Sequence, residues 1–153
     1  MQLVDFTTLD TQLLTLVLSW RNHPDIRHWM LNDDVISMEN HLQFIESLKQ
    51  RSDRRYFLVQ REGEYIGVID LTDITQTSAE IGIYTNPDIR GVGESLMCVL
   101  IEYAFSTLKL MTLIASVFAD NDRAKHLYEK FDFTETNRTL YNGREMITME
   151  LHK

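Results

Sequence analysis

The stretch that decides the fold is residues 86–105, "NPDIRGVGESLMCVLIEYAF". A β-rich run ends just before it, an arginine and two glycines follow, and apolar residues then recur at helical spacing. Residues 90–95 therefore predict a turn from a strand into a helix. Such a turn either serves chain geometry alone, or lets backbone N–H groups at the helix N-terminus approach an anion. Its spacing matches neither a Walker phosphate loop nor a dinucleotide-binding fingerprint.

The composition around this stretch is that of one compact chain. The 153 residues are 44% hydrophobic and include two prolines and six glycines, with no repeat or low-complexity tract, which predicts a single domain over residues 1–153. No apolar run approaches membrane-spanning length, and the N-terminal "MQLVDFTTLD" is acidic where a signal peptide is basic. Cys98 has no internal disulfide partner and is predicted to be a small core residue. These features predict a cytoplasmic protein.

The charge balance excludes some partners. A net charge of −8 and a pI near 5.0 speak against binding of nucleic acid or an anionic membrane through bulk electrostatics. A small polyanion would have to be held by local backbone donors and a few placed cations. No His, Cys or Asp cluster has metal-ligand spacing, so no metal is predicted.

The remaining elements follow from hydrophobic periodicity and turn signals. Ahead of the opening stretch we expect a strand at 2–6, a helix at 10–22, a short helix begun by Pro24, a helix at 37–50 and three antiparallel strands within 56–84. After its helix come a strand at 111–118, a helix at 121–131 and a hairpin around Asn142-Gly143. This order predicts an α/β (α+β) fold with a mixed, mostly antiparallel sheet of about seven strands flanked by helices.

Two of these helices have finer expectations. Ser37 is the expected N-cap of the helix at 37–50, whose buried stripe should comprise Met38, Leu42, Ile45 and Leu48. The helix that follows the glycines should bury a wide stripe against the sheet, running from Leu96 and Met97 to Leu108.

Two motifs carry a family resemblance. From Arg90 the spacing resembles the (Gln/Arg)-x-x-Gly-x-(Gly/Ala) motif of the GNAT superfamily of N-acetyltransferases, with Ser95 in the last position. Downstream, "NDRAKHLYEKFDF" resembles the family's Asn-x-x-Ala-x-x-Leu-Tyr-Glu-Lys-x-Gly-Phe helix, with Asp132 in place of the glycine, so we expect that turn to differ in detail. The motifs have the family's order and separation, and the resemblance covers essentially the whole chain. It implies the GNAT fold.

The resemblance also implies acetyl-CoA as cosubstrate and assigns residues to it. Backbone groups of Ile81, Gly82 and Ile83 would pair with the pantetheine arm. The pyrophosphate would be held by the loop made of Arg90, Gly91, Val92, Gly93, Glu94 and Ser95. Asn121 would hydrogen-bond the pantetheine, and Tyr128 would protonate the departing thiolate. The plainer interpretation of Tyr128 is core packing in an apolar helical stripe.

A base is needed to deprotonate the acceptor amine. In the strand "AEIGIY", alternation places Glu80, Gly82 and Tyr84 on one face. A glutamate on this strand is a common base in the family, which makes Glu80 a candidate, although a solvated carboxylate is the alternative. His41 is the rival or partner, with a surface or packing role as its alternative. Asp70 and its neighbour Asp73 read as strand-end and turn residues without a role.

A second resemblance, which begins in the N-terminal third of the chain, indicates the acceptor. The string "WRNHPDI…WM…IS…HLQFI", with "YIGVIDLT" and "EIGIYTNPDIRGVGE", resembles the GNAT branch of bacterial pseudaminic acid biosynthesis. That branch acetylates the 4-amino group of a UDP-linked 4-amino-4,6-dideoxy-N-acetylhexosamine, a precursor in flagellin glycosylation. The implied substrate-binding residues are Arg21 for the diphosphate, Trp29 and Met30 for apolar surface, and Tyr84 and His41 for the sugar. Their plainer interpretations are a helix C-terminal cation for Arg21, core for Trp29 and Met30, and a strand-end aromatic for Tyr84.

Rival functions stay open at this point. The Trp-Arg-Asn-x-Pro segment also occurs in ribosomal-protein N-terminal acetyltransferases, so acetylation of a protein N-terminus or a small amine is an alternative. A rival from another class is a non-catalytic acyl-CoA-binding module, which would have no need of Tyr128. Edge strands in such a sheet are compatible with a homodimer.

Overall fold

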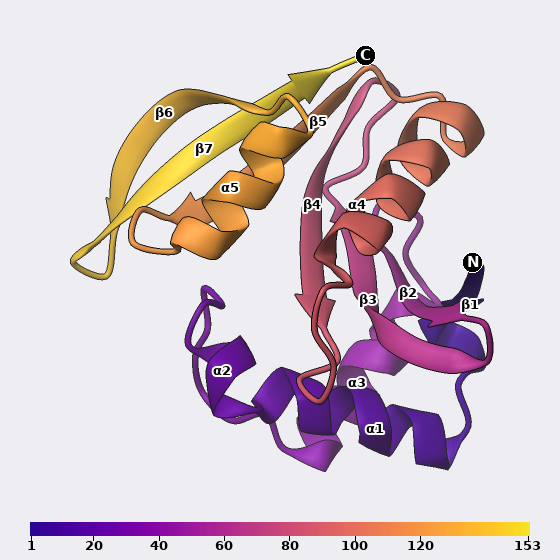
Figure 1. The fold of residues 1–153 in the computed structure, drawn as a ribbon. Coiled ribbons are helices and arrows are strands. Elements are labelled where there is room, and N and C mark those ends of the chain that lie inside the picture. The colour runs from indigo at the N-terminus through magenta and orange to yellow at the C-terminus, as the bar shows by residue number, and fades with distance from the viewer.

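The computed structural model describes residues 1–153 and contains one seven-stranded sheet with strand order β1-β2-β3-β4-β5-β7-β6 (Figure 1). The strands are β1 (Gln2–Asp5), β2 (Arg55–Arg61), β3 (Glu64–Thr72), β4 (Ser78–Thr85), β5 (Thr112–Phe118), β6 (Thr134–Tyr141) and β7 (Arg144–His152). Every neighbouring pair is antiparallel except β4 and β5, which are parallel. The predicted mixed, mostly antiparallel sheet is therefore confirmed.

Helices cover both faces of this sheet (Figure 1). They are α1 (Thr11–Asn22), α2 (Pro24–Arg27), α3 (Met38–Leu48), α4 (Gly93–Glu102) and α5 (Asp122–Lys130), with a 3₁₀ turn η1 (Phe6–Thr8) and a π turn η2 (Tyr103–Thr107) that extends α4. Strand alternation sends Leu58 and Val68 into a cluster with α1 and α3, whereas Phe57 and Ile69 join a larger cluster with α4 and α5. The sheet thus separates two cores.

Local sequence signals set the helix starts and the last hairpin. The Ser37 hydroxyl accepts a hydrogen bond from the Asn40 N–H at 3.1 Å, which confirms the predicted N-cap of α3. In the turn between β6 and β7, Asn142 and Gly143 have φ angles of 50° and 79°, so both adopt the left-handed conformation of the predicted two-residue turn.

Two burial predictions are wrong. Cys98 is exposed, because it lies roughly 200° around α4 from the buried Leu96. On α3, Met38 and Leu42 are exposed and His41 is buried with Ile45 and Leu48. The predicted stripe and the buried one both have helical spacing and share Ile45 and Leu48, so periodicity alone does not choose between them. Packing against α1 decides which face is buried.

The turn after α5 keeps the geometry that glycine favours. Asp132 has φ of +71°, and its N–H donates to the Glu129 carbonyl at 3.0 Å while the Phe133 N–H donates to the Tyr128 carbonyl at 3.0 Å. These two bonds form a Schellman cap. Aspartate tolerates the left-handed region better than most residues, so Asp132 can form this cap in place of glycine.

Candidate active site

The site begins where β4 and β5 diverge. The two strands pair only from Ser78 to Glu80 on β4, opposite Thr112 to Ile114 on β5. Beyond Glu80, β4 stays paired with β3 on one side only, and β5 turns away with β7 (Figure 1). The edge of β4 at Ile81, Gly82 and Ile83 therefore has no neighbouring strand. A free edge of this kind accepts an extended ligand as an additional strand.

The N-terminus of α4 lies directly after β4 in the chain. Gly91 has φ of +77°, and Val92 is the N-cap of α4 but makes no side-chain capping bond. The first helical backbone bond is donated by the Leu96 N–H. The N–H groups of Gly93, Glu94 and Ser95 thus have no capping partner, and together with the helix dipole they favour an anion.

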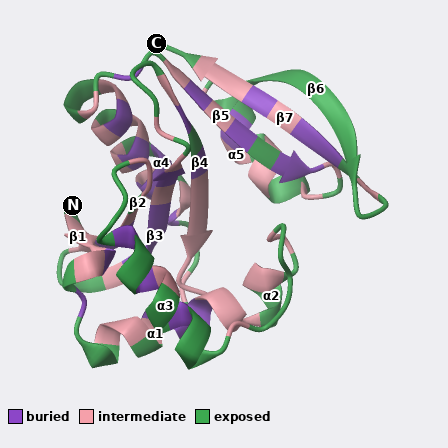
Figure 2. Ribbon diagram, turned by 180° about the vertical axis from the view of Figure 1, so that it is seen from behind, coloured by how far each residue is buried: buried purple, intermediate pink, exposed green.

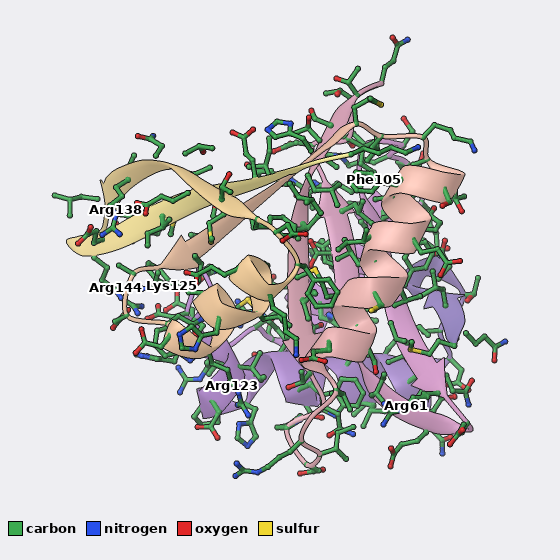
Figure 3. All side chains as sticks on the ribbon, turned by 45° about the horizontal axis from the view of Figure 1, so that its top comes forward. Arg61, Phe105, Arg123, Lys125, Arg138 and Arg144 are labelled. Atoms are coloured by element: carbon green, nitrogen blue, oxygen red, sulfur yellow. The ribbon has the colours of Figure 1, made fainter.

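Side chains of the same turn tie α4 to its surroundings. The Ser95 hydroxyl accepts a hydrogen bond from Arg61 of β2 at 3.2 Å; Arg61 is labelled in Figure 3. Glu94 forms an ion pair with Lys130 of α5. Ser95 therefore uses its hydroxyl inside the protein and keeps its backbone N–H for a ligand. Arg90 is exposed in the loop before the helix.

Helix α5 supplies two of the predicted residues. The side-chain oxygen of Asn121 caps the helix by accepting from the Ala124 N–H at 3.2 Å, which leaves the side-chain NH₂ free to donate. Tyr128 is 8% exposed and packs against Phe133 with ring centroids 5.3 Å apart. Burial, with a smaller effect of the Asp70 charge, raises the pKa of Tyr128 to about 12. Tyr128 therefore keeps its proton at neutral pH and can act as an acid.

The face of β4 that was predicted to carry Glu80, Gly82 and Tyr84 lies on the α1 side of the sheet. The register Thr72↔Glu80, Asp70↔Gly82 and Val68↔Tyr84 places Glu80, Gly82 and Tyr84 on one side of the sheet, as expected. Glu80 is exposed, whereas Tyr84 is half-buried. Burial raises the pKa of Tyr84, and the neighbouring Arg21 guanidinium opposes that shift.

Asp70 on β3 is a carboxyl to which the sequence assigned no role. Burial raises the pKa of its carboxyl to about 7, an effect that Arg54 opposes and Glu80 reinforces. The available signal was a single carboxylate within the apolar strand "YIGVIDLT". Its register with a glycine of the next strand could not be derived without knowing the sheet.

The segment between α1 and α3 is held in place by the last turn of α1. Arg21 donates a hydrogen bond to the Asn32 carbonyl, while its Nη1 atom is buried without a partner and burial lowers its pKa. The Asn22 side chain both accepts from and donates to the backbone of Ile36, each at 2.8 Å. Arg21 thus organises this segment and has one donor atom to spare.

Trp29 and Met30 are half-buried and belong to neither hydrophobic core. The guanidinium of Arg144, labelled beside the β6–β7 hairpin in Figure 3, lies 5.6 Å from the Trp29 ring centroid and 3.7 Å from that of Phe118. Arg144 also donates to the His28 carbonyl at 3.2 Å. The N-terminal segment therefore contacts the C-terminal hairpin, and the alternative of Trp29 as a core residue does not hold.

The His41 side chain forms no hydrogen bond with a side chain of the sheet. It is buried on α3, and burial lowers its pKa, partly offset by the Leu14 backbone, so the imidazole is neutral at pH 7. Its Nε2 atom has no partner. No hydrogen bond or ion pair joins it to Glu80 or Tyr84.

The structure offers neither a metal cluster nor a membrane-spanning helix. No group of three or more His, Cys, Asp or Glu side chains is placed to hold a metal ion. No helix has both the length and the apolar character needed to cross a membrane.

Residues 2–134 match the family model described as the acetyltransferase (GNAT) domain. The chain belongs to the GNAT acetyltransferase family. This membership confirms the resemblance of the two motifs and identifies the chain as an acetyltransferase. In this GNAT chain, β6 and β7 lie almost wholly beyond the matched residues and complete the sheet beside β5.

Comparisons with individual proteins show which GNAT enzymes the chain resembles. The GNAT chain is 46% identical to the acetyltransferase PseH of Campylobacter jejuni (strain 81-176) over 133 residues, which cover 87% of this chain and 84% of that protein. The crystal structure of C. jejuni N-acetyltransferase PseH in complex with acetyl coenzyme A matches with a TM-score of 0.84 and 36% identity, covering 99% of this chain and 98% of that one. Spermidine N-acetyltransferase from Vibrio cholerae, in complex with CoA and spermine, has a TM-score of 0.87 but only 22% identity over 99% of this chain and 94% of that one. This likeness to the Vibrio enzyme therefore shows the fold alone.

Proposed function

We propose that the protein transfers the acetyl group of acetyl-CoA to the 4-amino group of a UDP-linked 4-amino-4,6-dideoxy-N-acetylhexosamine. The reaction belongs to pseudaminic acid biosynthesis and serves flagellin glycosylation. The observation that carries the proposal is the 46% identity to PseH across 87% of the chain. The enzyme works as a single domain, residues 1–153, in the cytoplasm, where acetyl-CoA and nucleotide sugars are made.

The acetyl-CoA site of the proposal follows the open edge of β4. The pantetheine arm pairs with the backbone from Ile81 to Ile83 and receives a hydrogen bond from the Asn121 NH₂ group. The pyrophosphate lies on the free N–H groups of residues 91–95. The complex of PseH with acetyl coenzyme A supports this assignment.

The chemistry is direct transfer between two bound substrates. The acceptor amine attacks the thioester carbonyl, and Tyr128 gives its proton to the departing thiolate. A tyrosine whose pKa is raised to about 12 is fully protonated at pH 7 and suits this role. No metal is part of the proposal.

The acceptor occupies the α1 side of the sheet. The spare Nη1 donor of Arg21 binds the diphosphate, because a buried guanidinium N–H without a hydrogen-bond partner favours an anion. Trp29 and Met30 offer apolar surface to the uracil and the 6-deoxy sugar, and Tyr84 and Glu80 face the sugar ring. The buried His41, whose Nε2 atom has no partner within the protein, is a further proposed contact to the sugar.

The test is a mass-resolved transfer assay. Purified protein and acetyl-CoA are offered the UDP-4-amino sugar, its dTDP-linked analogue, spermidine and basic N-terminal peptides in parallel. We expect one added acetyl group on the UDP-sugar. Acetylation of a peptide or of spermidine instead would refute the acceptor and leave the acetyltransferase assignment in place. Binding of acetyl-CoA without transfer to any amine would favour a binding module.

The proposal includes a homodimer and no nucleic acid or membrane partner. Strand β6 is an edge of the sheet and is exposed along its whole length (Figure 2). Sedimentation velocity at micromolar concentration tests the dimer, and a monomer across that range would refute it.

A further inference from the structure

One carboxyl of the sheet lies in a space that a glycine leaves open. Asp70 on β3 is in register with Gly82 on β4 and Tyr56 on β2. A Cβ atom on residue 82 would lie 2.3 Å from one Asp70 carboxyl oxygen and 2.8 Å from the other. The carboxyl therefore leans across the backbone of Gly82, and any larger residue there would displace it.

The Asp70 carboxyl leans toward the free edge of β4. The last pair between β4 and β5 is Glu80↔Ile114, so Gly82 is two residues beyond the point where the strands part. The same stretch of backbone is the one proposed to bind the pantetheine arm. The carboxyl and the thioester would thus share the opening between the strands.

Asp70 is enclosed but reachable. It is half-buried even though β3 is an inner strand, and no protein donor forms a hydrogen bond with its carboxyl. Its oxygens are also not among the fully buried polar atoms that lack a partner. A carboxyl without internal partners that keeps accessible surface has its hydrogen-bonding capacity free for a ligand.

The titratable groups that interact with Asp70 lie on β2, β4 and α5 and just before β2. Its charge acts on Tyr56, Tyr84 and Tyr128, and the charged groups that act on it are Arg54 and Glu80. Arg21 reaches this cluster through Tyr56 and Tyr84. Asp70 is thus electrostatically coupled both to the proposed acid and to the proposed acceptor side.

We infer that Asp70 is the general base that deprotonates the acceptor amine, and that Gly82 is required because only glycine leaves room for its carboxyl. The inference rests on the proposed function. It assigns to Asp70 the role that the sequence alone suggested for Glu80 or His41. Glu80 is solvent-exposed, and His41 is buried on α3 with no hydrogen bond to this cluster.

The protons balance in this assignment. The Asp70 carboxylate takes one proton from the acceptor ammonium and later releases it to solvent. The neutral amine forms the C–N bond with the acetyl carbonyl carbon, and the C–S bond breaks as Tyr128 protonates the thiolate. The amine nitrogen then loses its second proton, which returns through water to the Tyr128 phenolate. The products are the acetamide and free CoA thiol.

The experiment measures kcat/KM against pH, because this ratio reports ionisations of the free enzyme and free substrate. We expect the wild type to show an acidic limb near pH 7. Asp70→Asn should lose this limb and about 100- to 1000-fold of kcat/KM at pH 7, and should show only the limb set by the pKa of the acceptor amine. The loss should shrink at high pH, where the amine is already neutral. Acetyl-CoA affinity measured by calorimetry should stay unchanged. Asp73→Asn, three residues along in the exposed turn, is the matched control and should keep the limb.

Replacing either of two charged residues near Asp70 should shift the acidic limb, in opposite directions for the two. Glu80 raises the pKa of Asp70 and Arg54 lowers it, so Glu80→Gln should move the limb to lower pH and Arg54→Gln to higher pH. If Glu80 were the base, Glu80→Gln would abolish the limb instead of moving it. Because the pKa of the free substrate is the same for all variants, a moved limb belongs to the enzyme.

Every outcome decides for or against Asp70. An Asp70→Asn enzyme with wild-type rate and limb would overturn the inference, as would a wild type with no enzymatic limb. If Asp70→Asn does not fold, Asp70→Glu tests the same group, because the longer side chain keeps a carboxyl but displaces it from the space over Gly82, and this variant should reduce kcat/KM while keeping the acidic limb. If the wild type leaves the UDP-amino sugar unmodified, the proposed function has failed, and the same profiles are measured with the amine that the transfer assay identifies.

Discussion

At the scale of single residues, the hydroxyl of Tyr128 is the group whose removal separates binding from chemistry. Tyr128→Phe keeps the ring against Phe133 and removes only the proton donor. We expect turnover to fall by roughly 10- to 1000-fold because the thiolate then leaves without general-acid assistance. Acetyl-CoA affinity should be near normal by calorimetry. Unchanged turnover would show that Tyr128 has a packing role alone.

The buried carboxyl of Asp70 should also affect the stability of the fold. Its pKa is near 3.8 when exposed and about 7 in the fold, so the folded state binds the extra proton between these values and wild-type stability should fall as pH rises through that window. Asp70→Asn lacks this penalty. The variant should therefore be more stable than the wild type above pH 7, by about 1–3 kcal/mol, and equal to it below about pH 4. Urea unfolding at pH 4 and pH 8 measures both, and a constant difference would contradict the buried carboxyl.

At the scale of elements, the start of α4 depends on a left-handed glycine. Gly91 and Gly63 have φ of 77° and 82°, and a Cβ atom on either would meet nothing within 4 Å. Alanine should thus cost each site about 1 kcal/mol of stability through backbone strain alone.

The two glycines differ in their positions relative to the proposed cosubstrate site. Gly91 orients the free N–H groups of the α4 N-terminus, whereas Gly63 lies in the turn between β2 and β3. Gly91→Ala should weaken acetyl-CoA binding about 5- to 10-fold, since the loop must regain its strained conformation on binding, and Gly63→Ala should leave binding unchanged. Calorimetry on both variants, with thermal unfolding as the stability measure, tests the pair. Equal acetyl-CoA affinity of the two variants would show that the loop at Gly91 does not contribute to cosubstrate binding.

At the scale of the whole molecule, Arg144 joins the first and last thirds of the chain. Its guanidinium contacts the rings of Trp29 and Phe118 and donates to the His28 carbonyl. Arg144→Ala should release the acceptor segment, raising the KM for the acceptor about 5- to 10-fold with little change in acetyl-CoA affinity. Arg138→Ala is the control, because Arg138 pairs only with Glu135 and Glu145 of the same hairpin. An equal effect of both variants would place the loss in the hairpin itself.

Much of the fold could be predicted because its signals are local. The apolar periods, the N-cap at Ser37 and the Asn142-Gly143 turn each act within a few residues of chain. Where two patterns shared the same period, as on α3, the sequence did not choose the buried face. Cys98 shows the same limit, since an apolar neighbourhood in sequence says little about which side of α4 meets the sheet.

The sequence by itself determined the order of elements, the family motifs and the N-cap at Ser37, because capping, periodicity and turn preferences depend on neighbours along the chain. The tertiary structure alone decided that β4 and β5 part after Glu80, that His41 is buried, and that Asp70 meets Gly82 across two strands. These depend on strand register and on packing between segments far apart in sequence. A carboxyl acquires a pKa near neutrality only through such long-range surroundings, which no short stretch of sequence contains.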